Sequence, residues 1–242
     1  IQRLEAGDTD DGRADYKSGK GFRARARHKG GGRSEFRGRG RGRSGASRQQ
    51  DRYRPLGRPE VLKVLQSQDM LPAITFIFSR AGCDGALYQC LRSRMVLTSQ
   101  EEAQQIKEIV DAGVEGIPEE DLQVLDFKRW REALSRGFAA HHAGMLPAFR
   151  HIVEDLFVRG LVRAVFATET LALGINMPAR TVVLEKLIKF NGEAHVDLTP
   201  GQYTQLTGRA GRRGIDTLGN AVVQWAPAMD PVSYTHLRAH ET

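Results

Sequence analysis

Hydrophobic positions alternate between two spacings from residue 58 onward. Residues 59–71 place apolar side chains on one face at helical spacing, and Pro72 ends that pattern. Residues 73–79 follow as a short apolar run rich in β-branched and aromatic side chains, which predicts a strand covered on both faces. Ser79 then stands where it would cap the next helix, although a nucleic-acid contact at the same hydroxyl is also open.

Two amphipathic helices are predicted next. The first spans 99–113 and begins with Ser99 and Glu102 at capping-box spacing, and the second spans 118–137. Strands are predicted at 138–144, 161–168, 181–185 and 219–225, and helical segments at 147–160, 169–175 and 199–213.

Strands that alternate with helices over most of the chain predict an α/β fold. We expect a parallel or mostly parallel sheet with helices on both faces. In such sheets the working groups lie on loops beyond the carboxyl ends of the strands.

Charge changes the picture only before residue 55. The chain has 242 residues and a formal net charge of +7, but residues 17–54 alone hold 14 Lys and Arg against Glu35 and Asp51. Residues 1–57 therefore read as a disordered Arg/Gly-rich linker or arm, because so few apolar groups cannot offset the entropy of ordering. Such a segment either binds single-stranded nucleic acid through its guanidinium groups or serves as a spacer, and both readings stay open.

The cysteines and histidines argue against a resident metal, and the cysteine usage also favours a reducing, cytoplasmic location. Cys83 and Cys90 are seven residues apart and fit neither a paired metal site nor a dense disulfide framework. His141 and His142 point to opposite faces of a strand and have no third ligand nearby in sequence. No apolar run is long enough to predict a membrane span.

The segment 205–216, QLTGRAGRRGID, interleaves glycine with arginine after a helix. If the helix continued, Arg209 and Arg212 would project from nearly the same face, where two guanidinium groups suit a polyphosphate. A solvated basic helix end is the alternative reading of the same residues.

Four segments together decide between these readings: ITFIFSRAGCD, FAAHHAGMLP, VFATETLALGINMPARTVV and QLTGRAGRRGID. They resemble, in order and spacing, the motifs of the second RecA-like domain of superfamily-two RNA helicases of the superkiller/HelY DExH-box type. The resemblance spans about residues 59–230. It implies an ATP-dependent RNA helicase that works on single-stranded or structured RNA.

The resemblance assigns roles by position. Arg209 and Arg212 match arginine fingers that reach ATP phosphates, while Gln205, Gly208, Gly174 and Asn176 match the nucleotide side of the cleft. The residues matched to nucleic-acid contacts are Ser79, Arg80, His142, Gly144, Thr168 and Glu169. For Thr168 an ordinary helix cap is compatible with that role, because one hydroxyl can do both.

A complete ATPase also needs a phosphate-binding loop and an acidic motif that holds Mg²⁺, and neither occurs in this sequence. We therefore expect the ATP and Mg²⁺ ligands to be completed by a first RecA-like domain in cis, and this chain alone to be inactive. The predicted boundaries are an arm at 1–57, the helicase domain at 58–230, and a non-native, unstructured tail at 231–242. The alternative function is a non-enzymatic RNA-binding module that acts through the arm.

Overall fold

The computed structural model of the chain describes residues 55–173 and 177–224. The predicted arm up to residue 54, the tail at 231–242, and the predicted nucleotide-side residues Gly174 and Asn176 lie outside these ranges.

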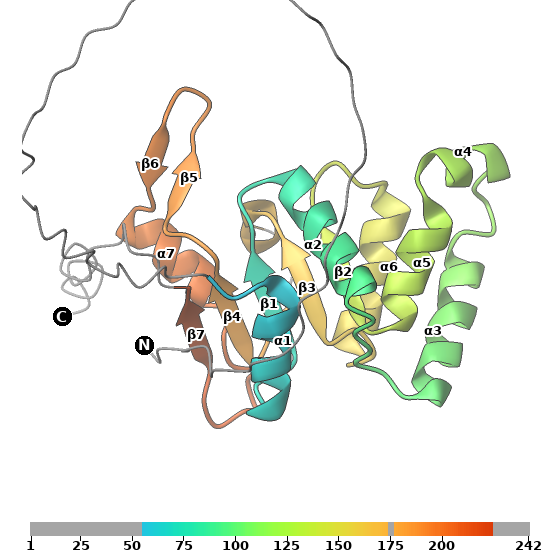
Figure 1. Cartoon of the computed structure of the whole chain (residues 1–242), viewed down its shortest axis with the longest axis horizontal. Coiled ribbons are helices and arrows are strands. Elements are labelled where there is room, and N and C mark those ends of the chain that lie inside the picture. Colours follow the sequence, from blue (N-terminus) through green and yellow to red (C-terminus); the bar gives the residue numbers. More distant parts are fainter. Residues whose placement is uncertain (1–54, 174–176, 225–242) are drawn as a thin grey trace, which may run out of the picture. The chain divides into compact units, whose positions relative to one another are not determined.

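A five-stranded parallel sheet forms the centre of the domain (Figure 1). Its strands, in the spatial order β2-β3-β1-β4-β7, are β2 (Phe138–His141), β3 (Ala164–Ala167), β1 (Ala73–Phe76), β4 (Thr181–Leu184) and β7 (Asn220–Val223). The four strands other than the edge strand β7 are buried along their whole length, as their continuous apolar patterns predict. The predicted parallel sheet is confirmed.

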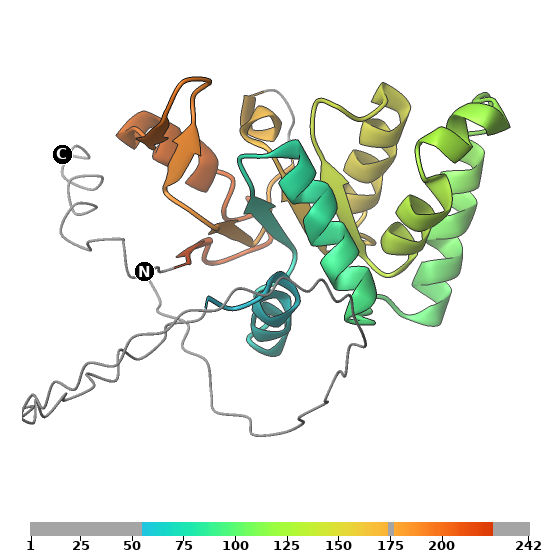
Figure 2. The ribbon, with the colours of Figure 1, turned by 45° about the horizontal axis from the view of Figure 1, so that its top comes forward.

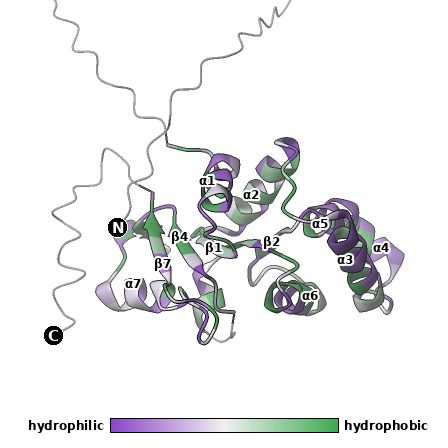
Figure 3. Cartoon of the chain, turned by 90° about the horizontal axis from the view of Figure 1, so that it is seen from below, coloured by the Kyte–Doolittle hydropathy of each residue, from purple (hydrophilic) through white to green (hydrophobic). Residues whose placement is uncertain are grey.

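Helices cover both faces of this sheet (Figures 2 and 3). One face carries α1 (Arg58–Ser67) and α2 (Arg80–Arg92), while the other carries α6 (Pro147–Val158), the 3₁₀ helix η1 (Glu169–Leu173) and α7 (Pro200–Thr207). Successive side chains of β1 divide between the two layers: Ile74 and Phe76 join one core, and Ala73 joins the other.

Local capping matches the sequence at the helix starts. Ser99 and Glu102 form a reciprocal capping box at the start of α3 (Gln100–Gly113), with nitrogen–oxygen distances of 2.8 and 3.2 Å. Thr199 and Gln202 do the same for α7, at 3.1 and 3.3 Å.

The predicted single helix at 118–137 is wrong, because the chain breaks there into α4 (Glu119–Val124) and α5 (Phe127–Ser135). Asp126 between them adopts φ 53°, a left-handed conformation that Asp tolerates better than most residues. The break lets Trp130 of α5 stack on Phe149 of α6, with ring centroids 4.1 Å apart and planes 12° apart. Together α3, α4 and α5 flank the β2 edge of the sheet (Figure 3).

The helix predicted at 199–213 also ends early, at Thr207. Ala210 instead pairs with Ala179 as an isolated parallel bridge, and Gly211 adopts φ 92°. Arg209 and Arg212 therefore do not share a helix face, and that expectation is wrong.

An antiparallel hairpin, β5 (Ile188–Phe190) and β6 (His195–Asp197), follows β4 and was not predicted. The sequence did contain a hairpin signal, because the turn-forming pair Asn191-Gly192 lies between segments in which polar and apolar residues alternate. In the structure the Asn191 side-chain oxygen accepts from the Glu193 and Ala194 amides at 3.0 and 2.9 Å.

None of the helices in the described ranges is long and apolar enough to cross a membrane.

Candidate functional site

The carboxyl ends of β1, β3 and β2 lie side by side at one edge of the sheet. The Ile77 amide after β1 donates to the Ala167 carbonyl at 2.8 Å, and the Thr168 amide after β3 donates to the His141 carbonyl at 3.3 Å. This edge therefore brings together the three loops that hold the predicted nucleic-acid residues.

Ser79 caps α2, as one of its two readings predicts. Its hydroxyl oxygen accepts from the Gly82 amide at 3.2 Å, while its backbone is extended, with φ −155°. The hydroxyl keeps its own hydrogen to donate. Ser79 and the following Arg80 are both exposed at the strand-tip edge.

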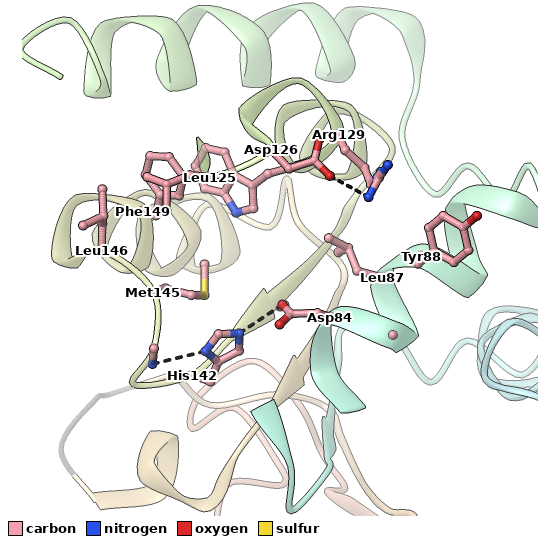
Figure 4. Close-up of a pocket in the computed structure, with 14 residues that line it drawn as sticks. Asp84, Leu87, Tyr88, Leu125, Asp126, Arg129, His142, Met145, Leu146 and Phe149 are labelled. Carbon is pink, nitrogen blue, oxygen red and sulfur yellow. Dashed lines mark hydrogen bonds and ion pairs between the residues drawn. The ribbon is translucent and has the colours of Figure 1, made fainter. Parts of the chain in front are cut away.

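His142 connects the loop after β2 to α2 (Figure 4). Its ring is buried, its Nε2 lies 3.0 Å from Asp84 Oδ1, and its Nδ1 accepts from the Gly144 amide at 3.2 Å. Because Nδ1 accepts a hydrogen bond, we assign the proton to Nε2, so that a neutral imidazole donates to the carboxylate. The two groups predicted to hold a phosphate thus already satisfy each other, and a phosphate at the Gly144 amide would have to replace that bond.

His141 belongs to the core instead. It is buried, and its Nε2 lies 2.8 Å from Glu154 Oε1 on α6. Burial lowers the pKa of His141, and the hydrogen bond that its ring donates to the Glu154 carboxylate opposes that shift. In the described ranges no three His, Cys, Asp or Glu side chains come together in a way that could hold a metal ion.

The loop after β3 is also internally bonded. The Thr168 hydroxyl pairs with the Thr170 hydroxyl at 2.9 Å, and the Thr168 carbonyl accepts from the Leu171 amide at 3.1 Å. Glu169 binds Lys189 Nζ of β5 at 2.7 Å, so its carboxylate ties the hairpin to η1.

The two predicted arginine fingers have different partners. Arg209 Nη2 donates to the Ala172 carbonyl of η1 at 2.6 Å, which joins the end of α7 to the loop after β3. Arg212 forms a two-pronged pair with Asp216, in which Nε and Nη2 each lie 2.8 Å from a carboxylate oxygen. These hydrogen bonds lower the pKa of Asp216 to about 2.

The remaining predicted nucleotide-side residues in the described ranges flank the end of α7. Gln205 is exposed on the helix, and Gly208 is its C-cap. A Cβ added at Gly208 would lie 2.9 Å from the Thr204 carbonyl oxygen, so glycine suits this close turn.

A cavity of about 470 Å³ lies beside the His142 turn, between α2, α5 and α6 (Figure 4). Its lining includes Asp84, Tyr88, Arg129, His142 and Phe149. The Arg129 guanidinium lies 5.4 Å from the centre of the Tyr88 ring. Nothing in the sequence pattern pointed to this cavity, because its walls come from three separate helices.

Residues 114–214 match the family described as Helicase conserved C-terminal domain. The chain is 64% identical over 190 residues to "Probable helicase HelY" of Mycobacterium tuberculosis. The matched stretch makes up 78% of this chain and 21% of that protein. It is 36% identical over 165 residues to "Antiviral helicase SKI2" of Saccharomyces cerevisiae, 68% of this chain and 13% of that protein. It is 40% identical over 163 residues to "Superkiller complex protein 2" of Homo sapiens, 67% of this chain and 13% of that protein.

The chain belongs to the superkiller/HelY group of helicases, as a helicase C-terminal domain. It spans about a fifth of the length of the HelY relative. The predicted family is therefore confirmed, while the roles of single residues in this helicase domain stay predictions.

Three functional candidates in the helicase domain were missed from the sequence. Asp84 and Lys189 bind predicted site residues from distant parts of the chain, which no local pattern reveals. Asp216 lies four residues after Arg212 at ion-pair spacing, so this partner was legible in the sequence.

Proposed function

We propose that this domain is the second motor half of an ATP-dependent RNA helicase. The observation that carries the proposal is the convergence of three loops, at Ser79, His142 and Thr168, on one carboxyl edge of the sheet, within a chain of the helicase family. Open α/β sheets bind their ligands at that edge.

RNA phosphates would lie along this edge. Arg80 offers an exposed guanidinium group, and the Ser79 hydroxyl offers a hydrogen-bond donor. Both are sequence-independent contacts, which suits a motor that must step along any strand.

ATP would be shared with a first RecA-like domain in cis, which would supply the phosphate-binding loop and the Mg²⁺ ligands. Arg209 and Arg212 would approach the γ-phosphate when the two domains close, and Gln205 and Gly208 would line the same cleft. Their guanidinium charge would stabilise the negative charge that develops during phosphoryl transfer. Hydrolysis and reopening would then shift the grip of the two domains on RNA.

The proposal is tested in the full-length helicase that contains this domain. Arg212→Ala and Arg209→Ala should each lower RNA-stimulated ATPase kcat, by about 10³-fold or more for a true arginine finger. Arg213→Ala, an exposed neighbour with the same charge, is the matched control and should leave kcat within about twofold. Full activity of both finger variants would contradict the assignment.

A further inference from the structure

The loop that holds Arg212 is fixed at both ends by close backbone contacts. Ala210 pairs with Ala179 at its start, and Gly219 packs against Ala210 at its end, so closely that a Cβ on Gly219 would lie 2.4 Å from the Ala210 oxygen. Arg212 is thus mounted on a loop that returns on itself before β7 begins.

Asp216 holds Arg212 at both ends of the residue. One carboxylate oxygen accepts from the Arg212 backbone amide at 2.9 Å and from Nε at 2.8 Å, and the other accepts from Nη2 at 2.8 Å. The Asp216 side chain is only 5% exposed, whereas the Arg212 side chain is 26% exposed. The carboxylate is therefore enclosed while part of the arginine still faces solvent.

A second arginine completes the surroundings of this carboxylate. Arg180 Nε lies 3.9 Å from Asp216 Oδ1, and Arg180 Nη1 binds Asp69 Oδ2 at 2.6 Å. Asp69 itself is 90% exposed. Two arginines and two aspartates thus form a neutral cluster, which keeps Asp216 ionised without drawing it away from Arg212.

The pair uses only one side of the Arg212 guanidinium. Five N–H groups are available on an arginine, and the Nε and Nη2 bonds to Asp216 occupy two of them. The other edge, formed by Nη1 and the second hydrogen of Nη2, donates to no residue in the described part of the chain. A planar fork of this kind can bind one anion on each edge at the same time.

We propose that Asp216 is a positioning residue that fixes Arg212 and presents its free Nη1–Nη2 edge to the γ-phosphate. The inference rests on the proposed function of Arg212 as an arginine finger. Asp216 does not contact the nucleotide; it removes the rotamer freedom that Arg212 would otherwise lose on each closure of the cleft.

The test compares Asp216→Asn, Asp216→Glu, Arg212→Ala and the double variant Asp216→Asn/Arg212→Ala in the full-length helicase. Steady-state RNA-stimulated ATPase is measured, with kcat and the KM for ATP determined separately. Asp216→Asn should lower kcat by about 10- to 100-fold, the usual effect of losing a partner that orients a functional group, and change KM less than about threefold. Asp216→Glu should recover part of kcat because it restores the charge.

The double variant separates positioning from general stability. In the Arg212→Ala background, Asp216→Asn should cause no further loss of kcat, because the residue it positions is gone. The matched control is Asp111→Asn, which breaks a two-pronged pair with Arg131 between α3 and α5, outside this cluster, and should leave kcat unchanged.

Three results overturn the inference: an Asp216→Asn kcat within about twofold of wild type, an increase in kcat, or an equal fall in the Arg212→Ala background. An increase would mean that Asp216 restrains Arg212 rather than presenting it. If Arg212→Ala itself keeps full kcat, the arginine-finger assignment fails, and this inference fails with it.

Discussion

At the scale of single residues, the two predicted fingers show how differently neighbouring arginines can be held. Arg209 donates to the Ala172 carbonyl, an acceptor that does not titrate, whereas Arg212 donates to the Asp216 carboxylate, which can be protonated. Protonation of Asp216 would break the second contact, so that contact makes the stability of the domain depend on pH.

Asp216 should therefore make a pH-dependent contribution to stability. Its pKa in the folded chain is about 2, below the ordinary value of 3.8, so its ionised form stabilises the fold above the ordinary value. That contribution is lost as the pH falls from about 4 through 2. Urea unfolding of this chain should show a stability gap between wild type and Asp216→Asn that is constant from pH 5 to 7 and narrows below about pH 4. A gap that stays constant down to pH 2.5 would contradict this.

Arg80 should contribute to RNA affinity through charge alone. Replacing it with alanine in the full-length helicase should weaken binding to single-stranded RNA of any sequence and reduce the slope of log K against log salt by about 0.7. Arg94→Ala is the control, because Arg94 is also exposed but follows the other end of α2. Equal effects of the two substitutions in a filter-binding or anisotropy titration would argue against a contact at the strand-tip edge.

The sequence identified candidate residues within contiguous motifs, but it did not reveal which hydrogen-bond partners their side chains and amides have in the fold. Nothing in FAAHHAG indicates that the Gly144 amide donates to His142, because that contact depends on a turn after β2 and on Asp84 of a distant helix. The side-chain direction of Arg212 was misjudged for a similar reason, since the early end of α7 depends on the pairing of Ala210 with Ala179.

At the scale of elements, the break between α4 and α5 shows tertiary packing prevailing over helix periodicity. The amphipathic pattern at 118–137 is continuous, yet the helix is interrupted at Asp126, which adopts a left-handed conformation. This break directs Trp130 onto Phe149. The parallel strands were predictable because each is a short apolar run between helices, whereas this break depends on an aromatic partner in α6.

Trp130→Ala should accordingly destabilise the domain by about 3–5 kcal/mol, since the side chain is 6% exposed and stacked on Phe149. Chemical denaturation of this chain measures the effect. Val124→Ala, at an α4 position that is 86% exposed, should change stability by less than about 0.5 kcal/mol. A loss below about 1 kcal/mol for Trp130→Ala would mean that the stacking does not hold the α3–α5 group against the sheet.

At the scale of the whole molecule, charge separates the basic segment from the helicase domain. Residues 55–242 hold 20 Lys and Arg against 22 Asp and Glu, so the excess positive charge lies before residue 55. Deleting residues 17–54 from the full-length helicase should leave RNA-stimulated ATPase kcat within about twofold, because the phosphate contacts we propose belong to the sheet edge. Loss of both RNA binding and ATPase on this deletion would favour the alternative, an RNA-binding module that acts through the arm.

Hydrogen bonds and an ion pair connect the first described residues of the domain to its later strands and its last described residue. The Gln224 side chain donates to the Leu56 carbonyl at 3.4 Å, and Arg58 at the start of α1 binds Glu185 after β4 at 2.5 and 3.0 Å. The first and last described residues of the domain therefore lie close together. Segments that precede and follow this domain in a longer helicase would therefore join it at neighbouring points, near Leu56 and Gln224.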